Sequence, residues 1–319
     1  MEREIMQYSR QLHTIVEAIG VAIIGKEPMV KLVVLSLVSG GHVLIEDVPG
    51  VGKTGLVSAL SRAVSCRFKR VQFTPDIMPS DITGFSVYNQ KTGEFEFRPG
   101  AAMSNFVLAD EINRASAKAQ ASLLEVMEER QVTIDGHTHR LPEPFMVLAT
   151  QNPVDNLGTY PLPEAQIDRF QIKISLGYPC YEEELRIITM TEAEKAGVPT
   201  AATGEDILAI REALEQVRAD PSLVQYIADI VTATRSHPAV LLGASPRGGI
   251  ALYRMSRALA VYEGRDYILP DDVKTLAPHV LSHRLMLRPE AKIDKVAPDG
   301  IVREILGNTP IPALGRRGQ

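Results

Sequence analysis

The sequence contains no tryptophan and only two cysteines, Cys66 and Cys180, among its 319 residues. Two cysteines are too few for a disulfide-rich scaffold or a cysteine-rich zinc fold, and such scarcity is typical of a reducing compartment. Long apolar runs are also missing, because Ser36 lies within the richest one and none approaches the ~18 residues of a membrane helix. The N-terminus lacks the apolar core of a signal peptide. We therefore expect a soluble, cytoplasmic protein without membrane insertion.

Basic charge is not in excess either. The chain carries 39 acidic and 34 basic residues, which gives a net charge of −5. Proteins that coat nucleic acids usually carry a basic excess, and base-stacking platforms are rich in aromatic residues, which make up only 5% of this sequence. The composition therefore disfavours a nucleic-acid partner and indicates an ordinary globular protein. At roughly 150 residues per domain, its length predicts about two domains.

Strand patterns and helix patterns alternate in the first half of the chain. Short apolar runs that predict five strands lie at residues 42–45, 71–73, 105–109, 145–149 and 170–176. Strands that alternate with helices predict an α/β fold with a parallel sheet covered on both faces. Two segments interrupt this rhythm and are predicted to be hairpins, residues 85–98 and residues 131–140, the second with an Asp-Gly turn.

Beyond about residue 179 the pattern becomes helical. Residues 196–204 are typical of a linker, and Ser245 and Pro246 supply an N-cap and a first-turn proline for one of the later helices. We predict an α/β domain over residues 1–178 and a second, smaller all-α lid domain, with its linker, over residues 179–319.

A glycine-rich loop is predicted between the first strand and the next helix. It matches the phosphate-loop pattern G-x-x-x-x-G-K-[ST] except at the first glycine position, which is Asp47. Glycines let backbone N–H groups approach phosphates closely, and a helix N-terminus adds a favourable dipole. Lys53 is expected to reach the β- and γ-phosphates of ATP, and the Thr54 hydroxyl to ligate Mg²⁺. The predicted nucleotide-binding residues of this loop are Pro49, Gly50, Val51, Gly52, Lys53, Thr54 and Gly55.

Polar residues at the ends of two further strands fit the same chemistry. Asp110 and Glu111 follow a buried-type strand, so that Asp110 can ligate Mg²⁺ and Glu111 can orient or deprotonate the attacking water. Asn152 follows the next strand, at the edge where open α/β sheets gather ligands, and can hold the water or the γ-phosphate. Arg169 and Arg247 complete the predicted catalytic set, because a guanidinium near the γ-phosphate stabilises the charge of the transition state.

These residues lie in stretches that resemble the AAA+ ATPases, and closely the MoxR family of the helix-2-insert branch. The matching stretches include GHVLIEDVPGVGKT, TGEFEFRPG, ADEINRA, LLEVMEERQVTIDG, LPEPFMVLATQNP and GTYPLPEAQIDRF, followed later by GASPRG. The resemblance implies a P-loop NTPase core, a helical lid and Mg²⁺-dependent ATP hydrolysis. It identifies residues 46–54 as the Walker A loop and residues 106–111 as the Walker B strand.

The same resemblance gives roles to residues outside these two motifs. Asn152 is similar to sensor 1, Arg169 to the arginine finger and Arg247 to sensor 2. The segment that usually lines the adenine corresponds to Ile23, Ile24 and Gly25. The two predicted hairpins correspond to the helix-2 insert and the pre-sensor-1 insert.

Family members of this kind work as homo-oligomeric rings, usually hexamers, in which each arginine finger completes a neighbour's site. Whether Arg247 acts on its own site or on a neighbour's stays open from the sequence, and Arg114 is a further interface candidate. The resemblance also implies chaperone-like remodelling of a client protein, including cofactor or metal insertion, with a von Willebrand factor A-domain protein as partner. It therefore implies an ATP-driven motor that acts on other proteins.

Two alternatives use the same ATPase site. A nucleic-acid-translocating motor would need basic hairpins or a DNA-binding segment, whereas the first hairpin carries two basic against two acidic residues. The motor subunit of a metal chelatase would differ only in its partner. The metal itself is not expected to bind here: His279 and His283 have zinc-like spacing, but the glutamate of the metalloprotease motif is absent between them.

Overall fold

The computed structural model describes residues 2–152 and 160–312, so Pro153, Gly158 and Thr159 of the motifs quoted above lie outside the described residues. Within these ranges, five parallel strands form the central sheet in the order β2-β5-β8-β1-β9. They are β1 (Val43–Glu46), β2 (Phe68–Gln72), β5 (Phe106–Asp110), β8 (Met146–Gln151) and β9 (Ile172–Ile174). The predicted parallel sheet is confirmed.

The fifth strand is shorter than the alternation over residues 170–176 predicts. It ends at Ile174 because the backbone N–H groups of Leu176 and Gly177 point to the carboxylate of Asp47 and do not continue the ladder with β1. Alternating apolar residues indicate which side chains are buried, and Leu176 is buried although it lies beyond the strand. The alternation does not indicate where the hydrogen bonds between strands end.

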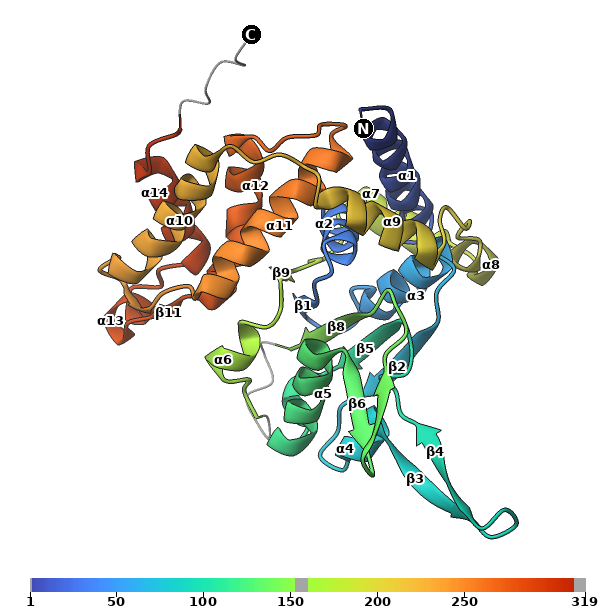
Figure 1. The fold of residues 1–319 in the computed structure, drawn as a ribbon. Helices are drawn as coiled ribbons and strands as arrows, with labels where there is room; N and C mark the ends of the chain where they lie inside the picture. Colours follow the sequence, from blue (N-terminus) through green and yellow to red (C-terminus); the bar gives the residue numbers. More distant parts are fainter. Residues whose placement is uncertain (1, 153–159, 313–319) are drawn as a thin grey trace.

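Side chains alternate between the two faces of the sheet and build two halves of the core. Leu108 and Leu148 pack into a cluster with α1 (Glu2–Gly20), α2 (Glu27–Val38) and α3 (Lys53–Ala63). Figure 1 shows these three helices above the sheet. On the opposite face, Ala109 and Ala149 pack with the buried face of α5 (Ala117–Glu129). Strands covered on both faces have near-continuous apolar sequences, which explains the runs seen in β5 and β8.

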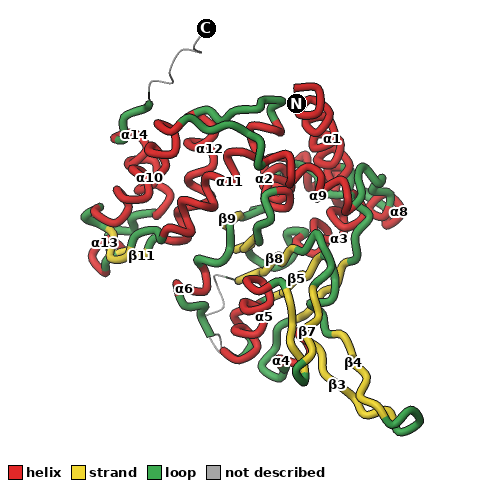
Figure 2. The backbone as a smooth tube through the Cα atoms, in the orientation of Figure 1, coloured by secondary structure: helices red, strands yellow, loops and turns green. Residues whose placement is uncertain are grey.

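Two antiparallel hairpins leave this core. One is formed by β3 (Gly84–Asn89) and β4 (Glu94–Pro99), after the short α4 (Pro79–Thr83), and the other by β6 (Gln131–Ile134) and β7 (His137–Arg140). Figure 2 shows both as yellow strand pairs on the side of the sheet away from the lid helices. The ring of Phe97 stacks on that of His139 with centroids 3.9 Å apart, so the two hairpins form one projecting unit.

The remainder of the chain is mainly helical, and a short antiparallel sheet is added to the otherwise all-α lid. The elements after β9 and the short α6 (Glu164–Ile167) are α7 (Tyr181–Thr189), α8 (Glu192–Ala196), α9 (Gly204–Leu214), α10 (Pro221–Ser236), β10 (Val240–Leu242), α11 (Pro246–Tyr262), α12 (Pro270–Leu281), β11 (Met286–Leu287), α13 (Pro289–Ile293) and α14 (Pro298–Asn308). As predicted, Ser245 caps α11 by accepting a hydrogen bond from the N–H of Arg247. Over the described part of the chain, no helix combines the length and the apolarity that a membrane span requires.

The lid helices and the N-terminal helices share one core. Buried residues of α1 and α2 belong to the same cluster as those of α9, α11 and α12. At the N-terminal helix, Ser9 Oγ donates to the carbonyl oxygen of Tyr262 at the end of α11, at 2.7 Å. The lid therefore has a fixed position relative to the sheet, which is the reason that residues of both parts can form a common site.

Candidate active site

The glycine-rich loop connects β1 to α3. Gly50 and Gly52 have φ angles of 87° and 91°, in the left-handed region that favours glycine, and no atom lies within 4 Å of the place where a Cβ would be. Open space over both glycines lets a phosphate approach the backbone closely beside the positive end of α3. The Nζ of Lys53 donates to the carbonyl oxygens of Asp47 and Val48 at 2.9 and 3.1 Å, so this ammonium folds back across the loop.

Asp47, at the first glycine position of the pattern, connects the loop to the chain beyond β9. Its buried carboxylate accepts hydrogen bonds from the N–H groups of Leu176 and Gly177, the latter at 3.0 Å, and from Ser175 Oγ at 3.3 Å. The residue that departs from the pattern therefore fixes the segment that continues as one wall of the neighbouring pocket.

A pocket of about 690 Å³ opens beside this loop. The predicted residues that line it are Ile23, Ile24, Pro49, Gly50, Val51, Gly52, Thr54 and Gly55. The facing wall comes from the segment after β9 and includes Tyr178, Ile187 and Ile188. Apolar walls next to a glycine-rich loop suit a purine base and its phosphates, and the volume is within the range of small-molecule sites.

Gly25 lies beside this pocket and does not line it. Its φ of 72° turns the chain between Ile24 and α2. A Cβ there would overlap the carboxylate of Glu183 at 1.8 Å, so the absence of a side chain at residue 25 lets α7 approach.

Asp110 and Glu111, at the end of β5, are fixed by the neighbouring strand β8. Thr150 Oγ1 donates to Oδ1 of Asp110 at 2.6 Å and accepts from the backbone N–H of Glu111 at 2.8 Å. Because Thr150 is completely buried, both acids keep a defined position relative to β8 and to Asn152 just after it. Arg70 of β2 donates from Nε to Asp110 at 3.1 Å. The sequence does not predict these roles of Thr150 and Arg70, because a polar residue within a strand carries no signal for its partner on the neighbouring strand.

Glu111 has a φ of 57°, an uncommon conformation for a residue with a side chain and one that recurs at functional sites. Gln72 Nε2 donates to Glu111 Oε2 at 2.7 Å, and Arg114 Nη1 contacts the same oxygen at 3.1 Å. The carboxylate is partly exposed and held from two sides, so a water next to it could transfer a proton to Oε1 or Oε2. Gln72, at the end of β2, is a further residue that sequence reasoning did not identify.

The residues fit a magnesium-bound nucleotide. Thr54 lies in the first turn of α3 and lines the pocket, while Asp110 presents a buried carboxylate at the end of β5. Mg²⁺ prefers such oxygen ligands and commonly takes only one or two from the protein, with phosphates and water completing the shell. No group of three or more His, Cys, Asp or Glu side chains with metal-binding geometry occurs within residues 2–152 and 160–312, and this includes the surroundings of His279 and His283. His283 instead contacts the carbonyl oxygen of Phe170 through Nε2 at 3.1 Å.

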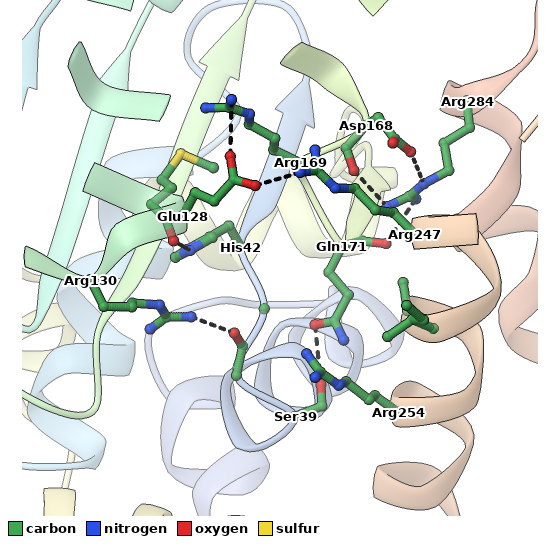
Figure 3. Close-up of a pocket in the computed structure, with 15 residues that line it drawn as sticks. Ser39, His42, Glu128, Arg130, Asp168, Arg169, Gln171, Arg247, Arg254 and Arg284 are labelled. Carbon is green, nitrogen blue, oxygen red and sulfur yellow. Dashed lines mark hydrogen bonds and ion pairs between the residues drawn. The ribbon is translucent and has the colours of Figure 1, made fainter. Parts of the chain in front are cut away.

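The two predicted arginines lie together at a different place. Arg169 Nη2 is 2.9 Å from Oε2 of Glu128, and Arg247 Nη2 pairs with the other oxygen of the same carboxylate. Both arginines line a second cavity, of about 400 Å³, which Figure 3 shows in close-up. Among the described residues that line the pocket beside the glycine-rich loop, neither arginine is included. Within the described residues, the two arginines therefore border a cavity other than the pocket beside the glycine-rich loop.

Asp168 joins the core segment of Arg169 to the lid segment of Arg247. Its carboxylate accepts from Arg284 Nε at 2.8 Å and from Ser245 Oγ at 2.7 Å. Arg284 is almost fully buried, and burial lowers the pKa of its guanidinium to about 10. Since Ser245 is the N-cap of α11, these contacts fix the helix that carries Arg247 against the segment that carries Arg169. Figure 3 shows the contact of Asp168 with Arg284.

Comparisons with known proteins match both parts of the chain. The ATPase family associated with various cellular activities (AAA) matches residues 42–172, and the AAA lid domain matches residues 232–305. The uncharacterized protein YeaC of Bacillus subtilis (strain 168) is 50% identical over 96% of this chain and 98% of its own length. Chaperone MoxR1 of Mycobacterium tuberculosis is 42% identical over 95% of this chain and 84% of its own. A solved structure of an ATPase candidate from Cytophaga hutchinsonii superposes with a TM-score of 0.91, at 40% identity over 98% of both chains.

Proposed function

The chain belongs to the MoxR family of AAA+ ATPases, and from this premise we propose that it hydrolyses Mg²⁺-ATP at the loop of residues 49–55 to remodel a partner protein. One observation carries the proposal. A pocket of about 690 Å³ opens beside a loop that has two glycines in the left-handed conformation. The sheet from which this loop emerges also carries, at the end of β5, a buried aspartate followed by a partly exposed glutamate. Chaperone-like maturation of complexes, including cofactor or metal insertion, is the form of work that the family relationship favours.

We assign a part in this reaction to five residues of the loop and of the strand ends near it. Thr54 and Asp110 would hold Mg²⁺, which would supply positive charge to the phosphates of the ATP substrate. Lys53 leaves the carbonyl oxygens that it contacts in the described structure and donates to the β- and γ-phosphate oxygens. Glu111 accepts the proton of the attacking water at its carboxylate, and Asn152 orients that water or the γ-phosphate.

Arg169 and Arg247 act on the site of a neighbouring subunit in a ring, for which we propose six subunits. This follows from their common position on Glu128 in a cavity apart from the pocket of their own chain. Arriving γ-phosphate oxygens replace the Glu128 carboxylate as the partner of both guanidiniums, because phosphate and carboxylate offer similar charged acceptors. Hydrolysis then depends on assembly, and Arg114 beside Glu111 remains a candidate for the same interface.

The client and the partner are expected to be proteins in the cytoplasm. The β3–β4 hairpin carries exposed aromatic rings, with Phe95 72% and Tyr88 53% exposed, which favours contact with polypeptide at that end of the molecule. A von Willebrand factor A-domain protein is the partner that the family relationship suggests. A chelatase motor or a nucleic-acid motor would use the same ATPase residues, so the partner that stimulates turnover distinguishes the three.

The reaction is tested with Glu111→Gln and Lys53→Ala. Glu111→Gln replaces the carboxylate between Gln72 and Arg114 by an amide of the same size, so we expect wild-type ATP binding. Turnover should be at least 100-fold lower, since a general base contributes a factor of about 10²–10⁴ to the rate. Lys53→Ala should lose ATP affinity. Glu125→Gln, at an exposed position of α5, is the matched control and should behave as wild type.

Normal turnover in Glu111→Gln would remove Glu111 from this role, and failure of the wild-type protein to bind ATP would remove the proposed function. The Glu111→Gln protein, held in ATP, also serves to retain clients in a pull-down. Stimulation of turnover by DNA and by no protein would favour the nucleic-acid motor, and stimulation by a tetrapyrrole-binding subunit would favour the chelatase motor.

A further inference from the structure

One face of α11 lines the arginine cavity. Ile250, Ala251 and Arg254 lie three, four and seven residues after Arg247, so the four share one side of the helix. All four border the cavity of about 400 Å³. Ile250 is 52% exposed although it lies within this lining. The α11 face therefore offers an apolar centre between two cations.

The cavity carries more positive than negative charge. Its charged lining residues are Arg130, Arg169, Arg247, Arg254, Arg284, Glu128 and Asp168. The two acids are engaged by Arg169, Arg247 and Arg284, as Figure 3 shows. Arg254 is exposed and forms no ion pair with any residue that the structure describes. The guanidinium of Arg130 donates to the carbonyl oxygens of Gly40 and Phe145 and lies 5.7 Å from the centre of the Phe145 ring.

Arg130 and Arg254 are near enough to affect each other. Burial, the charge of Arg211 and the charge of Arg254 lower the pKa of Arg130 to about 10, although Glu143 opposes this effect. An anionic group placed between the two guanidiniums would relieve this repulsion. The α11 face thus fits a partner that is apolar and acidic at once.

Helix α7 combines exposed apolar side chains with acidic ones. None of its residues is buried, and Tyr181, Leu185 and Ile188, at spacings of four and three, are 71%, 49% and 73% exposed. The first turn holds Glu182, Glu183 and Glu184. A helix that exposes apolar residues of this size on one side indicates a missing partner surface.

The two sides of α7 differ in what they contact. Glu184, Ile187 and Ile188 border the nucleotide pocket, whereas Tyr181, Glu182 and Leu185 are not among its lining residues. Tyr181 and Leu185 continue the stripe of Ile188 past the edge of the pocket, and Glu182 lies beyond them; we call these three residues the free side of α7. Helix α7 is therefore placed at the mouth of the pocket, with its free side available to another molecule.

We propose that the free side of α7 docks onto the α11 face of the neighbouring subunit, with Leu185 and Tyr181 against Ile250 and Glu182 toward Arg254. The proposal rests on the proposed function, because a ring in which Arg169 and Arg247 reach the next nucleotide pocket also brings the α11 face to the helix at the mouth of that pocket. Since ATP would contact the inner side of α7 through Ile187 and Ile188, nucleotide binding fixes the helix for docking and links assembly to the bound state.

Proximity is tested by cross-linking in the full chain. A variant with Leu185→Cys and Ile250→Cys, in a background of Cys66→Ala and Cys180→Ser, is treated with a short bismaleimide in ATP. We expect covalent oligomers up to the size of the ring. The control pairs Leu185→Cys with Val224→Cys, an exposed position of α10 outside the cavity, and should give no ladder.

A ring that assembles and hydrolyses ATP but gives no ladder, or an equal ladder in the Val224→Cys control, overturns the docking proposal and leaves the motor intact. A wild-type protein that neither binds ATP nor assembles overturns the proposed function itself. The two failures are therefore distinguishable.

Charge reversal tests the pairing of residues. Glu182→Arg and Arg254→Glu should each lower assembly and ATP turnover about tenfold, because like charges then face each other, and the double variant should recover to within about threefold of wild type. Single variants that assemble and turn over ATP as wild type overturn the proposal. A double variant with a wild-type melting temperature and no recovery overturns it as well.

Discussion

Arg169 of the core and Arg247 of the lid contact the two oxygens of a single carboxylate, that of Glu128 at the end of α5. A carboxylate that engages two guanidiniums keeps both of them extended in one direction, at the cavity where core and lid meet. In the proposed function, the γ-phosphate of a neighbouring subunit's ATP replaces Glu128 as the partner of both arginines. Because they share one partner, we expect the two arginines to act at the same site. Two predictions on mixed rings test this expectation.

The first prediction concerns Arg169 in trans. Arg169→Ala and Lys53→Ala subunits should each be inactive alone, whereas a mixture should regain a fraction of wild-type ATP turnover. Some interfaces in mixed rings place the intact Arg169 of one subunit beside the intact phosphate loop of the next. ATPase assays on mixtures, with co-assembly shown by mass photometry, provide the measurement. Co-assembled rings without any regained turnover would argue against a finger that acts on a neighbour.

The second prediction separates the two possible assignments of Arg247. When Arg169→Ala is mixed with Arg247→Ala, every interface lacks one arginine if both act on the same neighbouring site, so turnover should stay at the level of the single variants. If Arg247 instead served its own chain, some sites in the same mixture would contain both arginines. We expect no recovery in this mixture, and recovery of each variant with Lys53→Ala. Recovery in the first mixture would assign Arg247 to its own subunit.

A third prediction concerns Asp47, whose carboxylate accepts hydrogen bonds from Leu176, Gly177 and Ser175. Asp47→Asn places an NH₂ group among these donors and removes the charge, so the free energy of unfolding should fall by about 1.5–3 kcal/mol. Because the same segment continues to Tyr178 in the pocket wall, the Kd for ATP should also rise several-fold. Denaturant unfolding and a nucleotide-binding titration measure the two effects. Asp229→Asn, at an exposed position of α10, is the control, and an equal loss there would refute the role of Asp47.

The glycine-rich loop between β1 and α3 and the parallel sheet could be predicted because their signals are local. Lys53 and Thr54 follow two glycines within a few residues, and the apolar runs at β5 and β8 are set by burial of each strand on both faces. Such patterns involve residues that are close in the sequence, so they can be recognised before the fold is known. The parallel sheet with a helical lid was therefore predictable in outline.

Other parts of the site could not be predicted, because they depend on contacts between distant residues. Thr150 is 40 residues from Asp110 in the sequence, and only the pairing of β5 with β8 brings the two together. Glu128 is an exposed residue of an amphipathic helix, which carries no sequence signal for two arginine partners. Asp47 stands where the motif has a glycine, and its carboxylate binds the backbone N–H groups of Leu176 and Gly177. No pattern in the sequence around residue 47 indicates these distant partners.

His42 is a buried group whose protonation opposes folding. Its Nδ1 accepts a hydrogen bond from the N–H of Val147 at 2.9 Å, and its Nε2 is 3.2 Å from the carbonyl oxygen of Met127, so the neutral ring satisfies both contacts. Burial, followed by the charge of Arg130, lowers the pKa of His42 from 6.5 to about 3. Protonation of Nδ1 would remove the acceptor that Val147 needs.

The stability of the protein should therefore fall with pH below about 6.5. Between this value and the folded pKa of about 3, the unfolded chain binds a proton at His42 that the folded chain does not, so the contribution of the neutral ring is present above 6.5 and is lost as the pH falls. At pH 5 the loss from His42 is about 2 kcal/mol, at 1.36 kcal/mol per pKa unit. Urea unfolding at pH 7 and pH 5 should show a drop in His42→Gln that is smaller than in wild type by this amount. His137→Gln, at an exposed hairpin position, should keep the wild-type drop, and equal drops in all three proteins would show that His42 titrates alike in the folded and unfolded chain.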